Sequence, residues 1–302
     1  MQVATRTVCL EVQDNGPRSS PVALLIMGLG MQLTAWPQAF VDALVGDGLR
    51  VIRFDNRDIG LSQAFDHAKA RAIPWAIARR MLRLPVRPPY SLDAMSDDAV
   101  ALLDALGIER AHLCGVSMGG MIAQIVAIRH PQRVASLTLA MTSSGARDLP
   151  WPRPAAARAL LRRPRGRDAE ALVAYGVRLM RAIGSPGFPT PEAELSLQIR
   201  RWFERSYRPQ GVARQLLAIA AASDRTPRLA GLPMPVHIIH GLDDPLVPIE
   251  HGRQLARAIP RATADFVAGV GHDLPEAVWQ RLRRAVVGFA SASTSTSASG
   301  PR

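Results

Sequence analysis

The stretch 111–129, AHLCGVSMGGMIAQIVAIR, contains the pattern G-x-S-x-G at residues 115–119. The residues before the pattern are apolar and suit a buried strand, whereas those after it suit a helix. In a strand–turn–helix arrangement of this kind, the serine occupies a strained turn, and the residues two positions away must be small so that strand and helix can approach. The hydroxyl would then project at a helix N-terminus, where negative charge is favoured. The stretch therefore predicts Ser117 as a catalytic nucleophile.

A serine hydroxyl needs a general base, and His272 is the best candidate among the seven histidines. In G-x-S-x-G hydrolases the chain order is serine, acid, histidine, which excludes histidines that precede Ser117 or any plausible acid. His130 is excluded because it would lie about 18 Å away at the far end of the helix after Ser117. His251 falls at the start of a predicted helix, whereas His272 lies in the glycine-flanked loop GVGHD, which leaves it free to reach the serine.

The acid of the site should follow the strand that precedes the histidine loop. The segment 240–248, HGLDDPLVP, offers two candidates there, Asp243 and Asp244. Either would hold the imidazole in the required tautomer and stabilise the imidazolium that forms during the reaction.

The chain alternates short apolar runs with helix-like segments, which is typical of parallel β-α-β units. An uninterrupted apolar run, such as VALLIM at 22–27, indicates a strand covered on both faces. The predicted strands are 5–12, 22–27, 50–55, 111–115, 134–140, 235–240 and 263–267. The predicted helices are 38–45, 97–106, 118–129, 252–259 and one from about residue 275.

Two segments interrupt this alternation. Residues 147–232 are rich in Arg, Ala and Pro and have helical periodicity, so we expect a helical lid inserted between two strands of the sheet. Residues 65–90 form a smaller insertion with one amphipathic stretch. The expected organisation is a core of residues 1–146 and 233–290, the lid at 147–232, and a low-complexity, disordered tail at 291–302.

Three motifs, GVSMGG, HGLDDPLVP and GVGHDLP, resemble in this order and spacing the α/β-hydrolase superfamily. The resemblance implies the α/β-hydrolase fold, a mostly parallel sheet flanked by helices. It places the catalytic acid at Asp244 and leaves Asp243 as a neighbour. The segments MGLGMQLTAWP and RFDNRDIGLS most resemble a bacterial carboxylesterase branch that contains anthracycline methylesterases, with features of cofactor-free haloperoxidases.

An oxyanion hole needs two N–H donors. One is expected from the backbone of Met118, directly after the nucleophile. By resemblance the other is Leu29, in the loop Met27–Gly30, where relatives have a His-Gly sequence and this chain has Met. Residues 55–60, DNRDIG, resemble the family's D-x-R-G-x-G loop with Asp58 in place of glycine, and we expect a structural role for it.

The predicted function is hydrolysis of a small to medium, fairly apolar carboxylic ester through an acyl-enzyme. The same residues would also suit perhydrolysis, amide or C–C bond hydrolysis, and a hydrolase-fold ligand receptor is a further alternative. Among the apolar lid residues, Trp151, Met180 and Trp202 are candidates for substrate contact, with packing of the lid onto the core as the competing interpretation. The motifs imply no metal and no organic cofactor.

The net charge of +12 arises mostly in the two inserted segments. Because 36 of the 37 basic residues are arginine, the bias suggests codon usage rather than a phosphate-binding surface. No recognised nucleic-acid-binding module accompanies the charge, so we expect no nucleic-acid partner. No apolar run reaches the length of a membrane span, and the first residues lack the apolar core of a secretory signal, so a soluble cytoplasmic protein is expected, its oligomeric state unassigned.

Overall fold

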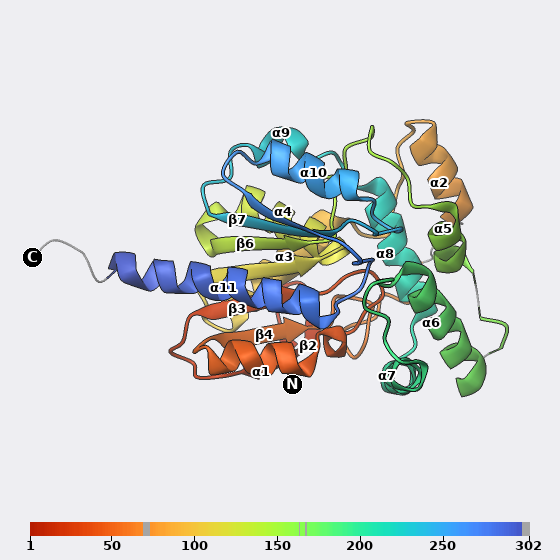
Figure 1. Cartoon of the computed structure of the whole chain (residues 1–302), viewed down its shortest axis with the longest axis horizontal. Coiled ribbons are helices and arrows are strands. Elements are labelled where there is room, and N and C mark those ends of the chain that lie inside the picture. Colours follow the sequence, from red (N-terminus) through yellow and green to blue (C-terminus); the bar gives the residue numbers. More distant parts are fainter. Residues whose placement is uncertain (69–72, 163, 167, 298–302) are drawn as a thin grey trace, which may run out of the picture.

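The computed structural model describes residues 1–68, 73–162, 164–166 and 168–297, and it contains a mostly parallel sheet flanked by helices (Figure 1). The strands follow one another across the sheet in the order β1-β2-β4-β3-β5-β6-β7-β8. The first two strands are antiparallel to their neighbours, and all the others are parallel. Their bounds are β1 Gln2–Ala4, β2 Cys9–Asn15, β3 Val22–Ile26, β4 Arg50–Phe54, β5 Ala111–Val116, β6 Val134–Ala140, β7 Val236–Gly241 and β8 Thr263–Val267.

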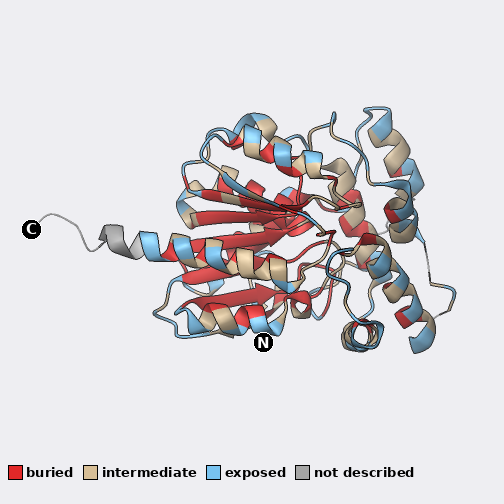
Figure 2. Cartoon of the chain, viewed as in Figure 1, coloured by how far each residue is buried: buried red, intermediate tan, exposed pale blue. Residues whose placement is uncertain are grey.

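The central strands are buried on both faces because helices cover each side of the sheet (Figure 2). Successive side chains of a strand point to opposite faces, so Leu24 joins one apolar cluster and Leu25 the other. The Leu24 face packs against α3, α4 and α10, and the Leu25 face against α1 and α11. The bounds of these helices are α1 Gln38–Gly46, α3 Leu92–Ala105, α4 Met118–Arg129, α10 Ile249–Ala258 and α11 Glu276–Ser297.

The segment between β6 and β7, called here the insertion (residues 147–232), is helical, as its periodicity predicted. Its helices α5 to α8 lie with α2 at one end of the sheet, on the right in Figure 1, whereas α9 lies beside α10. Short helices of 3₁₀ type lie at Leu33–Ala35 and Pro131–Arg133. The remaining helices are α2 Ile73–Met81, α5 Pro154–Leu161, α6 Ala169–Ile183, α7 Glu192–Arg205, α8 Pro209–Ala221 and α9 Thr226–Leu229.

Two predictions for the chain ends were wrong. The strand expected at 5–12 is β2, Cys9–Asn15, because Thr5 forms a turn in which both its N–H and its hydroxyl donate to the Val8 carbonyl. Residues 291–297, expected to be disordered, continue helix α11. Ala and Ser are tolerated in helices, and no Gly or Pro occurs in the sequence between Gly288 and Gly300. Residues 298–302 of the predicted tail, and 69–72 of the smaller predicted insertion, lie outside the described residues.

In the described part of the chain, no helix combines the length and apolarity that a membrane span requires.

A buried ion pair ties the insertion to the core. Arg214 of α8 donates two hydrogen bonds to Asp58, at 2.7 Å and 2.8 Å, and both side chains are almost fully buried. Asp58 stands where the family motif has glycine, and it adopts a positive φ of 72°. Burial opposes its ionisation, but hydrogen bonds from Arg214 and from the Phe65 N–H outweigh burial, so the pKa of Asp58 lies below its ordinary value.

The variant Asp58→Asn should lower the free energy of unfolding by about 3–5 kcal/mol at pH 7, because it removes the buried carboxylate that pairs with Arg214 and leaves this cation only the exposed Asp66, at 3.3 Å. Urea unfolding measures this loss. A group whose pKa is depressed on folding stabilises the protein above its unfolded pKa, so the difference from wild type should shrink below about pH 4. The matched control is Glu170→Gln in the exposed pair with Arg200, which should cost less than about 1 kcal/mol. Equal losses of unfolding free energy in the two variants would contradict a stabilising role for the buried Asp58–Arg214 pair.

Candidate active site

Ser117 occupies a strained turn between β5 and α4. Its φ of 54° and ψ of −120° lie outside the regions that non-glycine residues ordinarily adopt. The turn is tight because α4 lies close to both β5 and β3: a Cβ on Gly115 would lie 2.5 Å from the Gly119 carbonyl oxygen, and one on Gly119 would collide with the carbonyl oxygen of Ile26, at the end of β3. The Ser117 N–H donates to the Ala140 carbonyl at the end of β6, at 2.9 Å. The glycines of the motif thus serve the close approach that the sequence pattern predicted.

The side chains of Ser117, His272 and Asp244 form a continuous hydrogen-bonded series. His272 Nε2 lies 3.0 Å from Ser117 Oγ, and His272 Nδ1 lies 2.7 Å from Asp244 Oδ2. The three residues come from loops after β5, β8 and β7, and the carboxyl ends of parallel strands meet at one edge of the sheet. With Asp244 ionised, Nδ1 carries the proton, and Nε2 is then free to accept the serine proton.

The carboxylate of Asp244 is buried, and both of its oxygens accept hydrogen bonds. Its Oδ1 accepts the N–H groups of Leu246 and Val247, both at 2.8 Å. Burial opposes ionisation, but nearby His272, its hydrogen bond and the Val247 N–H outweigh burial, so the pKa of Asp244 lies below its ordinary value. Asp243 faces elsewhere and accepts the Gly269 N–H at 2.8 Å. The two adjacent carboxylates therefore hold different groups, and only Asp244 contacts the imidazole.

The loop that carries His272 is held by the end of α6. The His272 N–H donates to the Ile183 carbonyl at 2.7 Å, and the Gly271 N–H donates to Ser185 Oγ at 2.9 Å. The Ser185 hydroxyl in turn donates to Asp273, and its N–H bonds the same carboxylate at 3.2 Å. The insertion thus contributes directly to the position of the imidazole.

The two residues expected to supply the N–H groups of the oxyanion hole belong to segments that adjoin the serine. Met118 is the first residue of α4, and Leu29 follows Gly28, where a Cβ would lie only 3.1 Å from Ser117 Cβ. Within the described residues, neither the Met118 nor the Leu29 N–H donates to a protein acceptor.

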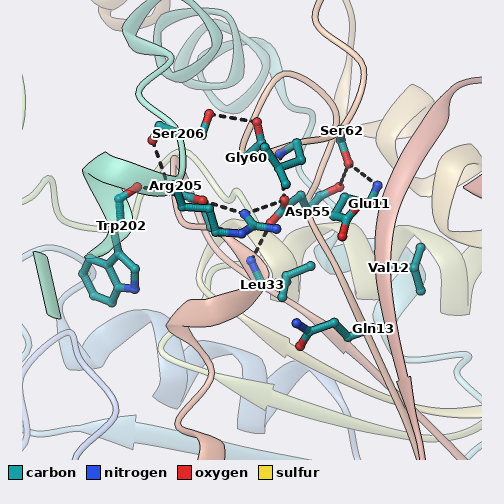
Figure 3. A network of polar contacts seen from close by, with 12 residues as sticks. Glu11, Val12, Gln13, Leu33, Asp55, Gly60, Ser62, Trp202, Arg205 and Ser206 are labelled. Carbon is teal, nitrogen blue, oxygen red and sulfur yellow. Dashed lines mark hydrogen bonds and ion pairs between the residues drawn. The ribbon is translucent and has the colours of Figure 1, made fainter. Parts of the chain in front are cut away.

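A polar network anchors the chain just beyond Leu29 to the insertion (Figure 3). Arg205, at the end of α7, donates to Gln32 at 2.6 Å and to Asp55 at 2.8 Å. Asp55 also accepts the Leu33 N–H at 2.6 Å, and Ser206 Oγ donates to the Gly60 carbonyl at 2.8 Å. Burial raises the pKa of Asp55, against the effect of these donors. Asp55 and Gly60, in the segment 55–60 for which a structural role was expected, thus make contacts that join the core to the insertion.

The three lid residues expected to contact substrate lie in different environments. Trp151 is 52% exposed. Met180 and Trp202 pack against a small apolar cluster between α6 and α7, and Trp202 also packs against the apolar cluster on the Leu25 face of the sheet. Met180 and Trp202 thus share in the packing of the insertion, and Trp151 is not a member of their cluster.

Among the described residues, no group of three or more His, Cys, Asp or Glu side chains could hold a metal ion.

Comparisons with known proteins fit this architecture. Residues 21–276 match the family described as alpha/beta hydrolase fold. Rhodomycin D methylesterase DauP of Streptomyces sp. strain C5 is 30% identical over 92% of this chain and 93% of its own length. The 3-oxoadipate enol-lactonase 2 of Acinetobacter baylyi is 28% identical over 88% and 87%. Among solved structures, the enol-lactonase from Burkholderia xenovorans LB400 superposes with a TM-score of 0.73 at 25% identity, covering 96% of this chain and 100% of that one.

The fold and its matches define an enzyme of the hydrolase class. The chain belongs to the α/β-hydrolase fold family, and its relatives include methylesterases and lactonases.

Several residues around the site escaped the sequence analysis. Ser185 and Gln215 lie in the insertion, where no local pattern distinguishes them from other polar residues. Asn56 lies inside a motif that was recognised, but its partner, the Met27 carbonyl, is a backbone group with no sequence signature.

Proposed function

We propose that the chain is a serine hydrolase that cleaves carboxylic esters through an acyl-enzyme, with Ser117, His272 and Asp244 as its catalytic triad. The single observation that carries the proposal is the series Ser117 Oγ–His272 Nε2, 3.0 Å, and His272 Nδ1–Asp244 Oδ2, 2.7 Å. A neutral imidazole held in this tautomer can take the hydroxyl proton as oxygen attacks a carbonyl.

The reaction has two halves. Ser117 Oγ bonds to the ester carbonyl carbon while its proton passes to His272 Nε2, and the carbonyl oxygen becomes an oxyanion that accepts the Leu29 and Met118 N–H groups. Collapse breaks the bond to the alcohol oxygen, which takes the proton from the imidazolium. Water then attacks the acyl-enzyme by the same route and releases the acid.

The substrate class is a small to medium, fairly apolar ester. The support is the combination of the triad with relatives whose names describe a methylesterase and an enol-lactonase, both of which cleave an acyl–oxygen bond. The insertion would act as the lid over this substrate, because it contacts both the histidine loop and the loop of Leu29. Trp151, Met180 and Trp202 stay candidates for its contact with the acyl or alcohol group.

A panel of p-nitrophenyl esters from acetate to decanoate tests the proposal, together with methyl esters of aromatic polyketides and five-membered enol-lactones. We expect turnover with an optimum at short or medium acyl length. Enzyme first inactivated with a fluorophosphonate, with the adduct mapped to Ser117 by mass spectrometry, is the control and should be inactive. A folded enzyme that cleaves none of these esters, but cleaves anilides or forms peracids, would overturn the ester assignment.

A further inference from the structure

The Leu29 N–H lies within a tight turn. The Met31 N–H donates to the Gly28 carbonyl at 3.3 Å, and Gly30 has a φ of +69°, as a type II turn requires at its third residue. The carbonyl of the Gly28–Leu29 peptide is therefore engaged inside the turn. In a trans peptide the N–H points opposite to the carbonyl, so the Leu29 N–H is directed out of the turn.

The peptide before this one is held by Asn56, which follows β4. Its Nδ2 donates to the Met27 carbonyl at 2.9 Å, and the side chain is 2% exposed. The orientation of the chain as it enters the turn is thus set by a buried amide of the core.

The peptide after it is held by Gln215 of α8, in the insertion. The Gly30 N–H donates to Gln215 Oε1 at 2.9 Å, and Gln215 Nε2 donates to the Arg57 carbonyl at 3.0 Å. The side chain has no exposed surface, and a Cβ on Gly30 would lie 3.1 Å from Val212 of the same helix. Gln215 therefore bridges the turn to the segment that contains Asn56.

We propose that Asn56 and Gln215 are positioning residues that together hold the Gly28–Leu29 peptide with its N–H directed at the oxyanion site beside Ser117. The inference rests on the proposed serine-ester mechanism and adds residues to it. Neither amide contacts the reacting atoms: each fixes the peptide on one side of the donor. Because Gln215 belongs to the insertion, its hydrogen bond to the Gly30 N–H connects the lid to the proposed oxyanion hole.

This role differs measurably from a purely structural one. Loss of a buried amide lowers the stability of the protein wherever it occurs. Only a misdirected oxyanion donor also reduces stabilisation of the transition state while the affinity for the ester stays the same. Loss of a donor outright costs about 10²–10³ in kcat, so a donor that is displaced but present should cost about 10–100-fold.

The test uses Asn56→Leu and Gln215→Met, which keep side-chain size and remove the hydrogen bonds. Each should lower kcat for the preferred p-nitrophenyl ester by about 10–100-fold and leave KM within about twofold. The second-order rate of Ser117 labelling by a fluorophosphonate should fall in parallel, since its phosphoryl oxygen uses the same donors. The matched control is Gln124→Met, a fully buried amide that bonds the Ser143 carbonyl and Arg225 instead, and it should lose thermal stability without this kinetic change.

The outcomes separate this inference from the proposed function. If wild type cleaves esters and both variants keep its kcat, or lose it only as much as Gln124→Met does, the positioning role is wrong and the esterase assignment stands. A rise in KM at constant kcat would likewise overturn the role. If wild type neither cleaves esters nor reacts with the fluorophosphonate, the proposed function falls and takes the inference with it. Should a variant fail to fold, the labelling rate of the other one decides.

Discussion

Replacing Ser117 by alanine should lower kcat for ester hydrolysis by about 10⁵- to 10⁶-fold and leave KM nearly unchanged. The variant removes the oxygen that bonds to the carbonyl carbon, so no acyl-enzyme can form, while the surfaces that bind the ester persist. Removing one hydroxyl should scarcely change the fold, because the backbone N–H to Ala140 keeps the turn in place. Initial rates at high enzyme concentration, with an active-site titration of wild type, measure the loss.

The matched control for this variant is Ser136→Ala. Ser136 is a buried serine in β6, bonded to His112 at 2.8 Å and remote from the triad. It should cost some stability and little activity. Ser117→Ala that retained more than about one per cent of wild-type kcat would show that another group is the nucleophile.

Ser117 and His272, the proposed nucleophile and base, could be selected from the sequence because each lies in a recognisable local pattern. Ser117 has glycines on both sides in a strand–turn–helix context, and His272 lies in a glycine-flanked loop after the final strand. Parallel strands bring such loops together at one edge of the sheet, so chain order alone predicts their meeting. The helical nature of the insertion was equally visible in its periodicity.

What could not be predicted depends on contacts between distant parts of the chain. Gln215 and Gly30 are 185 residues apart, and nothing in either segment indicates their hydrogen bond. Both ends of β2 were misplaced for a related reason. The apolar alternation at Val8, Leu10 and Val12 does not show where the preceding turn ends. The polar residues up to Asn15 belong to the strand because their backbone pairs with β4. Alternation locates the buried face, whereas the partner strand decides where pairing begins and ends.

Asp244→Asn should lower kcat by about 10⁴-fold, with little change in KM. In the variant, the NH₂ group of the asparagine can only donate a hydrogen bond to the imidazole. His272 Nδ1 must then be the acceptor, so the ring proton moves to Nε2. A protonated Nε2 can no longer take the proton of Ser117. The substitution removes a charge and keeps the shape. The hydrogen bonds that Oδ1 receives from the Leu246 and Val247 N–H groups persist if the amide oxygen takes that place.

The neighbouring carboxylate provides the comparison within the same loop. Asp243→Asn keeps an acceptor for the Gly269 N–H and leaves the imidazole untouched, so kcat should stay within about threefold of wild type. Both variants remove one negative charge from adjacent residues, and a general electrostatic effect on the site would therefore lower both activities alike. A large difference between them assigns the acid to Asp244 because only its carboxylate meets His272 Nδ1, at 2.7 Å. Equal losses would mean that the loop as a whole, rather than one hydrogen bond to the ring, sets the basicity of His272.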